Sequence, residues 1–294
     1  MKSLLLLCCQ LLAVFATPLV LPDDALVEQA FLSDAQGASA LPATNSHQDA
    51  IYIDHSSSSG RQVEPMIRPS WFTSVLMARR LLALSTSGVA STIFPSSLPP
   101  NGHTPPSVAG HSISLREYFA DCDEALPSSY KYANNGDGNP TLLALKVATT
   151  FRNTAAGSNI SLSLDWWDHI NDTEPIYPGF PLSPAGLPRV TLFGYVEPFP
   201  EPIPEDVETA LEKCYLRAHP DAEVWLPHKR GSPHSSFWAR MVVTDVYWIG
   251  GFGDVQQIGW MDVKEWAGVR RKGSVEGVGD GRGWEDVRLP GEKQ

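Results

Sequence analysis

One stretch near the carboxyl end, residues 235–260, most constrains what this chain can fold into. It reads SSFWARMVVTDVYWIGGFGDVQQIGW, and its β-branched, aromatic and Gly-rich turn character is typical of a largely buried strand followed by a hairpin-like reversal. One face, which begins at Phe237, is apolar, and the opposite face also carries Trp238 and Val242. Because a half-solvated strand would alternate more cleanly, the pattern predicts a strand covered on both faces.

The first residues have the pattern of a secretory signal peptide. Lys2 precedes an apolar run from Leu4 to Phe15, so we expect a signal over residues 1–16 with cleavage near Ala16. The run is shorter than the ~20 residues that a membrane-spanning helix needs, and we expect no membrane span elsewhere. The sequence therefore predicts a secreted protein.

Composition divides the remainder into three parts. Residues 17–67 are rich in Ala, Ser, Pro and Asp and are expected to form a mostly disordered leader or propeptide, because such a segment buries too little apolar surface to order itself. Residues 268–294 alternate Gly with charged residues, so we expect a disordered tail. Between them, residues 68–267 are enough for one domain with a substantial core.

Secretion changes how the cysteines are interpreted. Cys8 and Cys9 leave with the signal, and Cys122 and Cys214 remain. In an oxidising compartment two cysteines most simply form one disulfide, and two buried free thiols are the alternative. By the loop-entropy argument, closing so long a loop contributes ~4 to 5 kcal/mol.

Two sequons agree with secretion. Asn159 stands in Asn-Ile-Ser and Asn171 in Asn-Asp-Thr, so both are predicted N-glycosylation sites. The formal net charge of -11 argues against nucleic-acid binding, which needs a clustered basic surface.

Local patterns predict a mainly β, α+β domain. Helical spacing begins at Trp71 after the candidate cap Ser70, and a second helix with an acidic first turn begins at Glu205. Before residues 235–260, strands are predicted at residues 89–94, 113–120, 142–149, 160–166 and 190–196. Proline-rich loops and the lack of a βαβ rhythm favour a six-stranded antiparallel barrel, closed or nearly closed.

The common catalytic motifs are missing, and we predict no catalytic residue. The Gly250–Gly253 sequence GGFG is interpreted as a β-turn. His228 and His234 lack a third ligand nearby in the sequence, so we predict solvated loop histidines and no metal site. Asp121 and Asp123, at a strand end, are expected to face water.

One corner allows two interpretations. Thr149, Thr150 and Arg152 leave a predicted strand and enter a short helical link, so their hydroxyl, guanidinium and backbone N–H groups are candidate ligands of a phosphate. The alternative is an arginine at the start of an ordinary surface helix.

Residues 75–266 resemble the CREG-like secreted glycoproteins, a branch of the FMN-binding split-barrel superfamily that includes pyridoxamine-5′-phosphate oxidase. The resemblance lies in five segments in this order: ARRLLALSTSGVASTIF, NPTLLALKVATTF, GSNISLSLDW, EKCYLRAHPDAEVWLP and SFWARMVVTDVYWIGGFG.

The resemblance implies a six-stranded split barrel and a homodimer. In the superfamily's enzymes the flavin site lies at the subunit interface, and the corner that Thr150 and Arg152 occupy here holds the flavin phosphate. The resemblance to CREG-like members implies that the chain lacks flavin oxidase activity, because loop insertions fill the pocket in that branch. This chain has proline-rich insertions at residues 95–106 and 175–188.

The resulting hypothesis is a non-catalytic glycoprotein of the secreted or endolysosomal (vacuolar) route, without a cofactor, that binds an unidentified protein or glycan partner. The alternative is an FMN-dependent oxidoreductase in which Thr149, Thr150 and Arg152 bind the FMN phosphate.

Overall fold

The computed structural model describes residues 67–99, 102–130, 137–176, 181–253 and 255–293. The predicted signal and nearly all of the predicted leader lie outside these residues. The α-helices are α2 (Trp71–Leu84), α3 (Thr149–Ala155), α4 (Glu205–Ala218) and α5 (Val263–Gly268). The strands are β1 (Ser87–Ile93), β2 (Ser112–Tyr118), β3 (Thr141–Leu145), β4 (Ile160–Asp165), β5 (Arg189–Pro198), β6 (Ser236–Ile249) and β7 (Ile258–Met261). None of the described helices combines the length and the apolar character needed to cross a bilayer.

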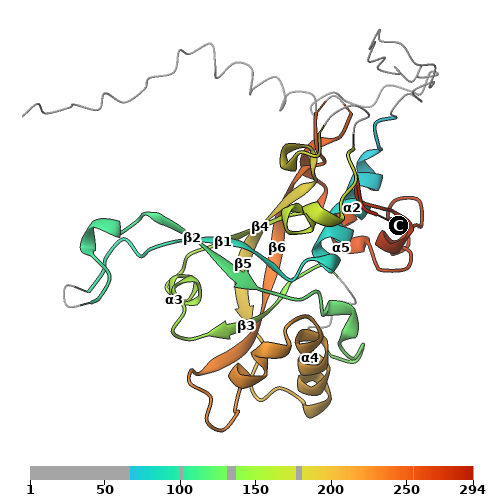
Figure 1. Ribbon diagram of the computed structural model, residues 1–294. Helices are drawn as coiled ribbons and strands as arrows, with labels where there is room; N and C mark the ends of the chain where they lie inside the picture. Colours follow the sequence, from blue (N-terminus) through green and yellow to red (C-terminus); the bar gives the residue numbers. More distant parts are fainter. Residues whose placement is uncertain (1–66, 100–101, 131–136, 177–180, 254, 294) are drawn as a thin grey trace, which may run out of the picture. The chain divides into compact units, whose positions relative to one another are not determined.

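The strands form one antiparallel sheet that curls into a half-barrel (Figure 1). Six strands follow the order β2-β1-β4-β5-β6-β3, and the short β7 pairs with the end of β6 that β3 leaves free. The edges at β2 and β3 meet at an isolated bridge, where the backbone groups of Ala120 and Thr141 exchange hydrogen bonds of 3.0 and 2.8 Å. The prediction of a mainly β, six-stranded split barrel is therefore confirmed.

Two helices cover two separate cores. Helix α2 begins where predicted, because the Ser70 hydroxyl accepts a 3.1 Å hydrogen bond from the Thr73 backbone N–H. Its buried face, which includes Leu76 and Leu81, joins the barrel interior in the first core. Helix α4 has an acidic first turn, as expected, and packs its buried face into a second core with Trp238.

Strand β6 is where the two cores meet. Trp238 belongs to the second core and its neighbour Ala239 to the first, because successive side chains of a strand point to opposite faces. Coverage on both faces is therefore confirmed for this half of the strand. It is wrong further along, where Thr244 and Asp245 are exposed. The GGFG sequence forms the turn from β6 to β7, and the Gly250 N–H donates to the Gln257 oxygen at 3.0 Å.

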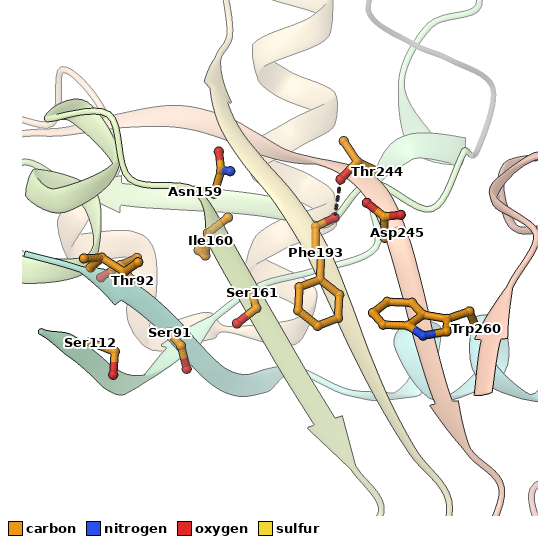
Figure 2. A pocket seen from close by; sticks show the side chains of 11 residues that line it. Ser91, Thr92, Ser112, Asn159, Ile160, Ser161, Phe193, Thr244, Asp245 and Trp260 are labelled. Carbon is orange, nitrogen blue, oxygen red and sulfur yellow. Dashed lines mark hydrogen bonds between the residues drawn. The ribbon is translucent and has the colours of Figure 1, made fainter. Parts of the chain in front are cut away.

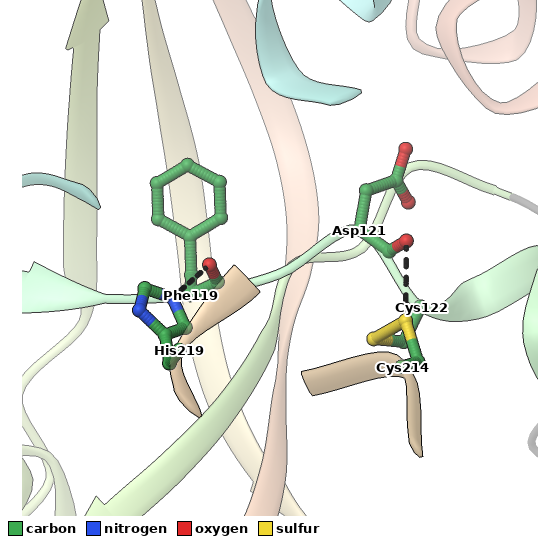
Figure 3. Close-up of a disulfide and its surroundings, with 5 residues drawn as sticks. All are labelled: Phe119, Asp121, Cys122, Cys214 and His219. Carbon is green, nitrogen blue, oxygen red and sulfur yellow. Dashed lines mark hydrogen bonds between the residues drawn. A yellow bond between two sulfur atoms is a disulfide. The ribbon is translucent and has the colours of Figure 1, made fainter. Parts of the chain in front are cut away.

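The predicted disulfide is present. Cys122 and Cys214 are bonded, with Cα atoms 5.8 Å apart, and they are 92 positions apart in sequence. The bond joins α4 to the segment after β2, just before the short 3₁₀ helix η3 (Asp123–Ala125), inside the second core (Figure 3).

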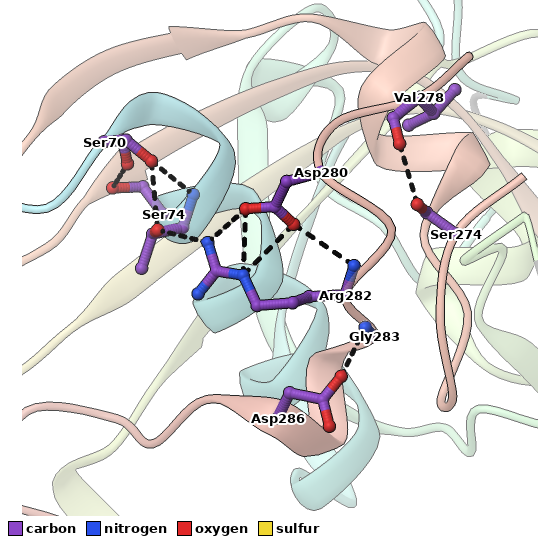
Figure 4. Close-up of polar contacts among 9 residues, drawn as sticks. Ser70, Ser74, Ser274, Val278, Asp280, Arg282, Gly283 and Asp286 are labelled. Carbon is purple, nitrogen blue, oxygen red and sulfur yellow. Dashed lines mark hydrogen bonds and ion pairs between the residues drawn. The ribbon is translucent and has the colours of Figure 1, made fainter. Parts of the chain in front are cut away.

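The expectation of a disordered tail over residues 268–294 is wrong for residues 268–293. Val269, Val287 and Leu289 are buried in the first core, and Arg282 donates to the Thr73 hydroxyl of α2 at 3.0 Å. Figure 4 shows this loop folded beside the first turn of α2. Its glycines supply tight turns, several at positive φ, so a few well-placed apolar residues are enough to fix the segment. The Gly and charge content of this segment does not reveal those apolar contacts.

Candidate functional site

The corner between β3 and α3 has a different local structure from the one predicted. The strand expected over residues 142–149 ends at Leu145, and Thr149 already begins α3. The residue before the helix, Ala148, provides no side-chain cap. The corner therefore presents the start of a short helix, as expected for either interpretation.

A carboxylate occupies this corner. Thr150 is buried, and its Oγ1 donates a 2.5 Å hydrogen bond to Oε1 of Glu117, which is on β2. Burial raises the pKa of Glu117, and the hydrogen bond from Thr150 opposes that rise. Sequence reasoning missed Glu117, because nothing in a strand sequence shows which helix its polar side chain will meet.

The predicted phosphate ligands do not fit a phosphate in this arrangement. Arg152 is exposed and lies in the last turn of α3, whereas Thr149 is half-buried and Thr150 is engaged with Glu117. A phosphate dianion needs several convergent donors. Here the charged group bonded to Thr150 is an anion, which would repel a phosphate.

A small cavity adjoins the corner. Its volume is about 150 Å³, and it lies between β2, β3, α3, α4 and the 3₁₀ helix η6 (Pro220–Trp225). Cofactor and drug-sized ligand sites usually measure about 300–1,000 Å³. The cavity of this one chain is smaller than such sites.

A larger groove of about 500 Å³ lies on the open face of the sheet, across β1, β4, β5, β6 and β7 (Figure 2). Trp260 is 51% exposed there, and its ring centroid lies 5.5 Å from that of Phe193 and 5.1 Å from that of Tyr247. Hydroxyl groups, including those of Ser161 and Thr244, also line the groove, together with Asn159 and Asp245. No local sequence pattern predicts this groove, and Trp260, in a short strand, is the one signal of it in the sequence.

The family can be assigned from the sequence. The profile described as "CREG, beta-barrel" matches residues 70–268, which is more than half of the chain. The chain belongs to the CREG beta-barrel family. The resemblance found in the sequence analysis is thereby confirmed, and no curated protein matches the chain.

Several solved structures are similar to this CREG-family chain at low identity, with TM-scores below 0.5. A heme binding protein from Mycobacterium smegmatis is 18% identical, with a TM-score of 0.43 over 68% of this chain and 61% of the other. The chain thus spans less than two thirds of that protein. An FAD-binding protein from Mesorhizobium loti is 13% identical, with a TM-score of 0.33 over 57% and 87% of the two chains. An F420 reductase is 13% identical, with a TM-score of 0.32 over 56% and 92%.

The acids predicted to face water instead form a buried cluster in this CREG-family chain. Asp123 is 1% exposed, and its Oδ2 accepts the Asn139 N–H at 2.9 Å. Burial raises the pKa of Asp123 to about 7, and the neighbouring charge of Asp121 adds to the rise. Nη2 of Arg79, on α2, lies 3.9 Å from Oδ2 of Asp121. The cluster links the segment after β2 to α2 and to Asn139 through these polar contacts.

The remaining predicted sites lie at the surface. Asn159 is exposed and lines the groove just before β4, and Asn171 is exposed in a 3₁₀ helix. His228 and His234 are exposed in a loop, as expected. Within the described ranges, no three His, Cys, Asp or Glu side chains are grouped to hold a metal ion.

Proposed function

We propose that this CREG-family chain is a non-catalytic glycoprotein, secreted or endolysosomal, that acts by binding a partner through the open face of its sheet. A second copy of the chain is the first partner, so that the working form is a homodimer. The observation that carries the proposal is Trp260, which stands half exposed against Phe193 in the 500 Å³ groove. Aromatic side chains of this kind are enriched at protein interfaces.

The hydrogen bond between Glu117 and Thr150 at the corner between β3 and α3 supports a role without flavin. Binding the FMN phosphate there would require displacing Glu117 from Thr150 or neutralising its charge. The exposed Arg152 supplies one cation, whereas phosphate sites recruit several donors. The disulfide between Cys122 and Cys214 supports passage through an oxidising compartment.

The dimer is tested by measuring the molar mass in solution by light scattering. Wild-type protein is expected to elute at twice the chain mass, and Trp260→Ser to shift the equilibrium toward monomer. Trp167→Ser is the matched control, because Trp167 is 47% exposed but lies outside the groove. Since Asn159 lines the groove, where a glycan would obstruct a second copy of the chain, Asn159→Gln protein is measured as well and is expected to dimerise at least as strongly as wild type. A wild-type monomer, or equal effects of the two tryptophan variants, would contradict this interface.

Flavin is tested by titrating FMN and following flavin fluorescence. We expect no saturable quenching. Saturable binding that Arg152→Ala abolishes would overturn the non-catalytic proposal and favour the flavin-dependent oxidoreductase.

A further inference from the structure

The 150 Å³ cavity beside Glu117 has walls of an unusual composition. Four of the residues that line it are aromatic, and they come from β2, α3, α4 and η6: Tyr118, Phe151, Tyr215 and Trp225. Phe151 and Tyr215 are buried, whereas Tyr118 is 45% exposed, so the cavity opens to solvent beside β2. The Tyr118 ring is held in place by stacking on His219, at 4.2 Å between ring centroids.

The charge that lines the cavity is negative. Glu117 accepts its hydrogen bond through Oε1, which leaves Oε2 with the capacity to bind a further donor. The other lining charge, on Arg116, is balanced by Asp168 at 2.8 Å. The pKa of the Tyr215 phenol is raised by burial, and the negative charges of Glu117 and Asp221 raise it further.

Aromatic side chains around a carboxylate are the recognition chemistry of organic ammonium ions. Aromatic faces attract a cation through their quadrupole, and cages of such rings bind quaternary ammonium groups. Size agrees as well, since a cavity of about 150 Å³ holds a molecule as large as benzene, which is comparable to a trimethylammonium group.

We propose that this cavity binds a small organic ammonium group, with Glu117 as its counter-ion. The hydroxyl of Thr150 positions the carboxylate, and the four aromatic residues surround the cation. This site lies beside the corner and uses none of the groove residues, so the inference goes beyond the proposed partner binding.

The test compares choline with 3,3-dimethylbutan-1-ol, its uncharged isostere, by calorimetric titration of the full-length wild-type protein. Choline is expected to bind with a millimolar or lower dissociation constant, and the neutral isostere about tenfold or more weakly, the ratio that ~1.4 kcal/mol of charge recognition gives. No saturable binding at ~50 mM choline, where a millimolar site is filled, or equal affinity for the two ligands, would overturn the inference.

The variant Glu117→Gln tests whether the charge of Glu117 contributes to choline binding. Its amide oxygen still accepts the Thr150 hydrogen bond, so the side chain keeps its place while its charge is lost. We expect choline affinity to fall about tenfold or more, to the level of the neutral isostere. Glu276→Gln, an exposed carboxylate outside the cavity, should leave it unchanged. Unchanged choline affinity in folded Glu117→Gln protein would also overturn the inference.

If Glu117→Gln does not fold, the comparison of choline with its isostere on wild-type protein decides alone. The two proposals fail separately. Protein that binds neither FMN nor choline overturns only the ammonium site, whereas saturable FMN binding that Arg152→Ala abolishes overturns the non-catalytic function.

Discussion

The guanidinium of Arg79 donates a 2.8 Å hydrogen bond to the backbone oxygen of Trp266, 187 positions further along the chain. A second bond of 2.9 Å reaches the oxygen of Val269, and the guanidinium carbon lies 5.2 Å from the Trp266 ring centroid. Arg79 is fully buried, and its charge is opposed by Asp121 and Asp123. One side chain therefore fastens α2 to α5, to the C-terminal segment and to the acids after β2.

Replacing Arg79 should lower the free energy of unfolding. Arg79→Met keeps an apolar stem but leaves Asp121 and Asp123 buried without a cation, for which we expect a loss of ~3–5 kcal/mol of unfolding free energy. Arg116→Met is the control, because the Arg116 side chain is 52% exposed in its ion pair, and such pairs contribute about 0–1 kcal/mol. Urea denaturation measures both, and equal losses would show that Arg79 has no special role.

The C-terminal segment should be part of the folding unit. Removing residues 268–294 deletes Val269, Val287 and Leu289 from the core, and each such side chain contributes ~1.5–3 kcal/mol when fully buried. We expect the truncated chain to lose several kcal/mol or to lose cooperative unfolding, as measured by thermal denaturation. Removing only Lys293 and Gln294 should change little. A truncated chain as stable as wild type would show that the segment is dispensable.

The sequence predicted most of the fold because most elements have a local signature. The period-two alternation that begins at Ile160 matches β4, and the Ser70 cap and the acidic start at Glu205 match α2 and α4. The disulfide followed from compartment and count, since Cys122 and Cys214 had no other partner.

The site could not be predicted in the same way. Glu117 and Thr150 are 33 positions apart, and their contact exists only once β2 and α3 are in place. The burial of Asp123 was not expected because a strand-end acid is normally solvated, whereas here Asn139 bonds to Asp123, and Arg79 of α2 lies beside its neighbour Asp121. Long-range burial, and not local composition, decided each of these cases.

The disulfide should stabilise the protein without being needed for the fold. His219 at the end of α4 makes a 2.9 Å hydrogen bond to the Phe119 oxygen (Figure 3), so a second contact holds α4 near the same segment. We expect the double variant Cys122→Ser, Cys214→Ser to fold with a loss of ~4 to 5 kcal/mol, the value for a loop of this length. Urea denaturation with and without reductant measures the loss. Reductant should destabilise wild type and leave the double variant unchanged, and alkylation of both cysteines in native, unreduced wild type would contradict the bond.

The contribution of Asp123 to stability should increase as the pH falls from about 7 to about 4. Burial, together with the charge of Asp121, raises the pKa of Asp123 to about 7, whereas an unfolded aspartate titrates near ~3.9. The folded protein thus binds this proton more tightly, so the contribution is fully present below the unfolded pKa and is lost as the pH rises through 7. Asp123→Asn keeps an oxygen for the Asn139 N–H and removes the titration. At pH ~8 this variant should be more stable than wild type by a few kcal/mol, and at pH ~4 the two should agree. Asp245→Asn, an exposed acid in the groove, should follow the wild-type profile, and parallel profiles for wild type and Asp123→Asn would refute the assignment.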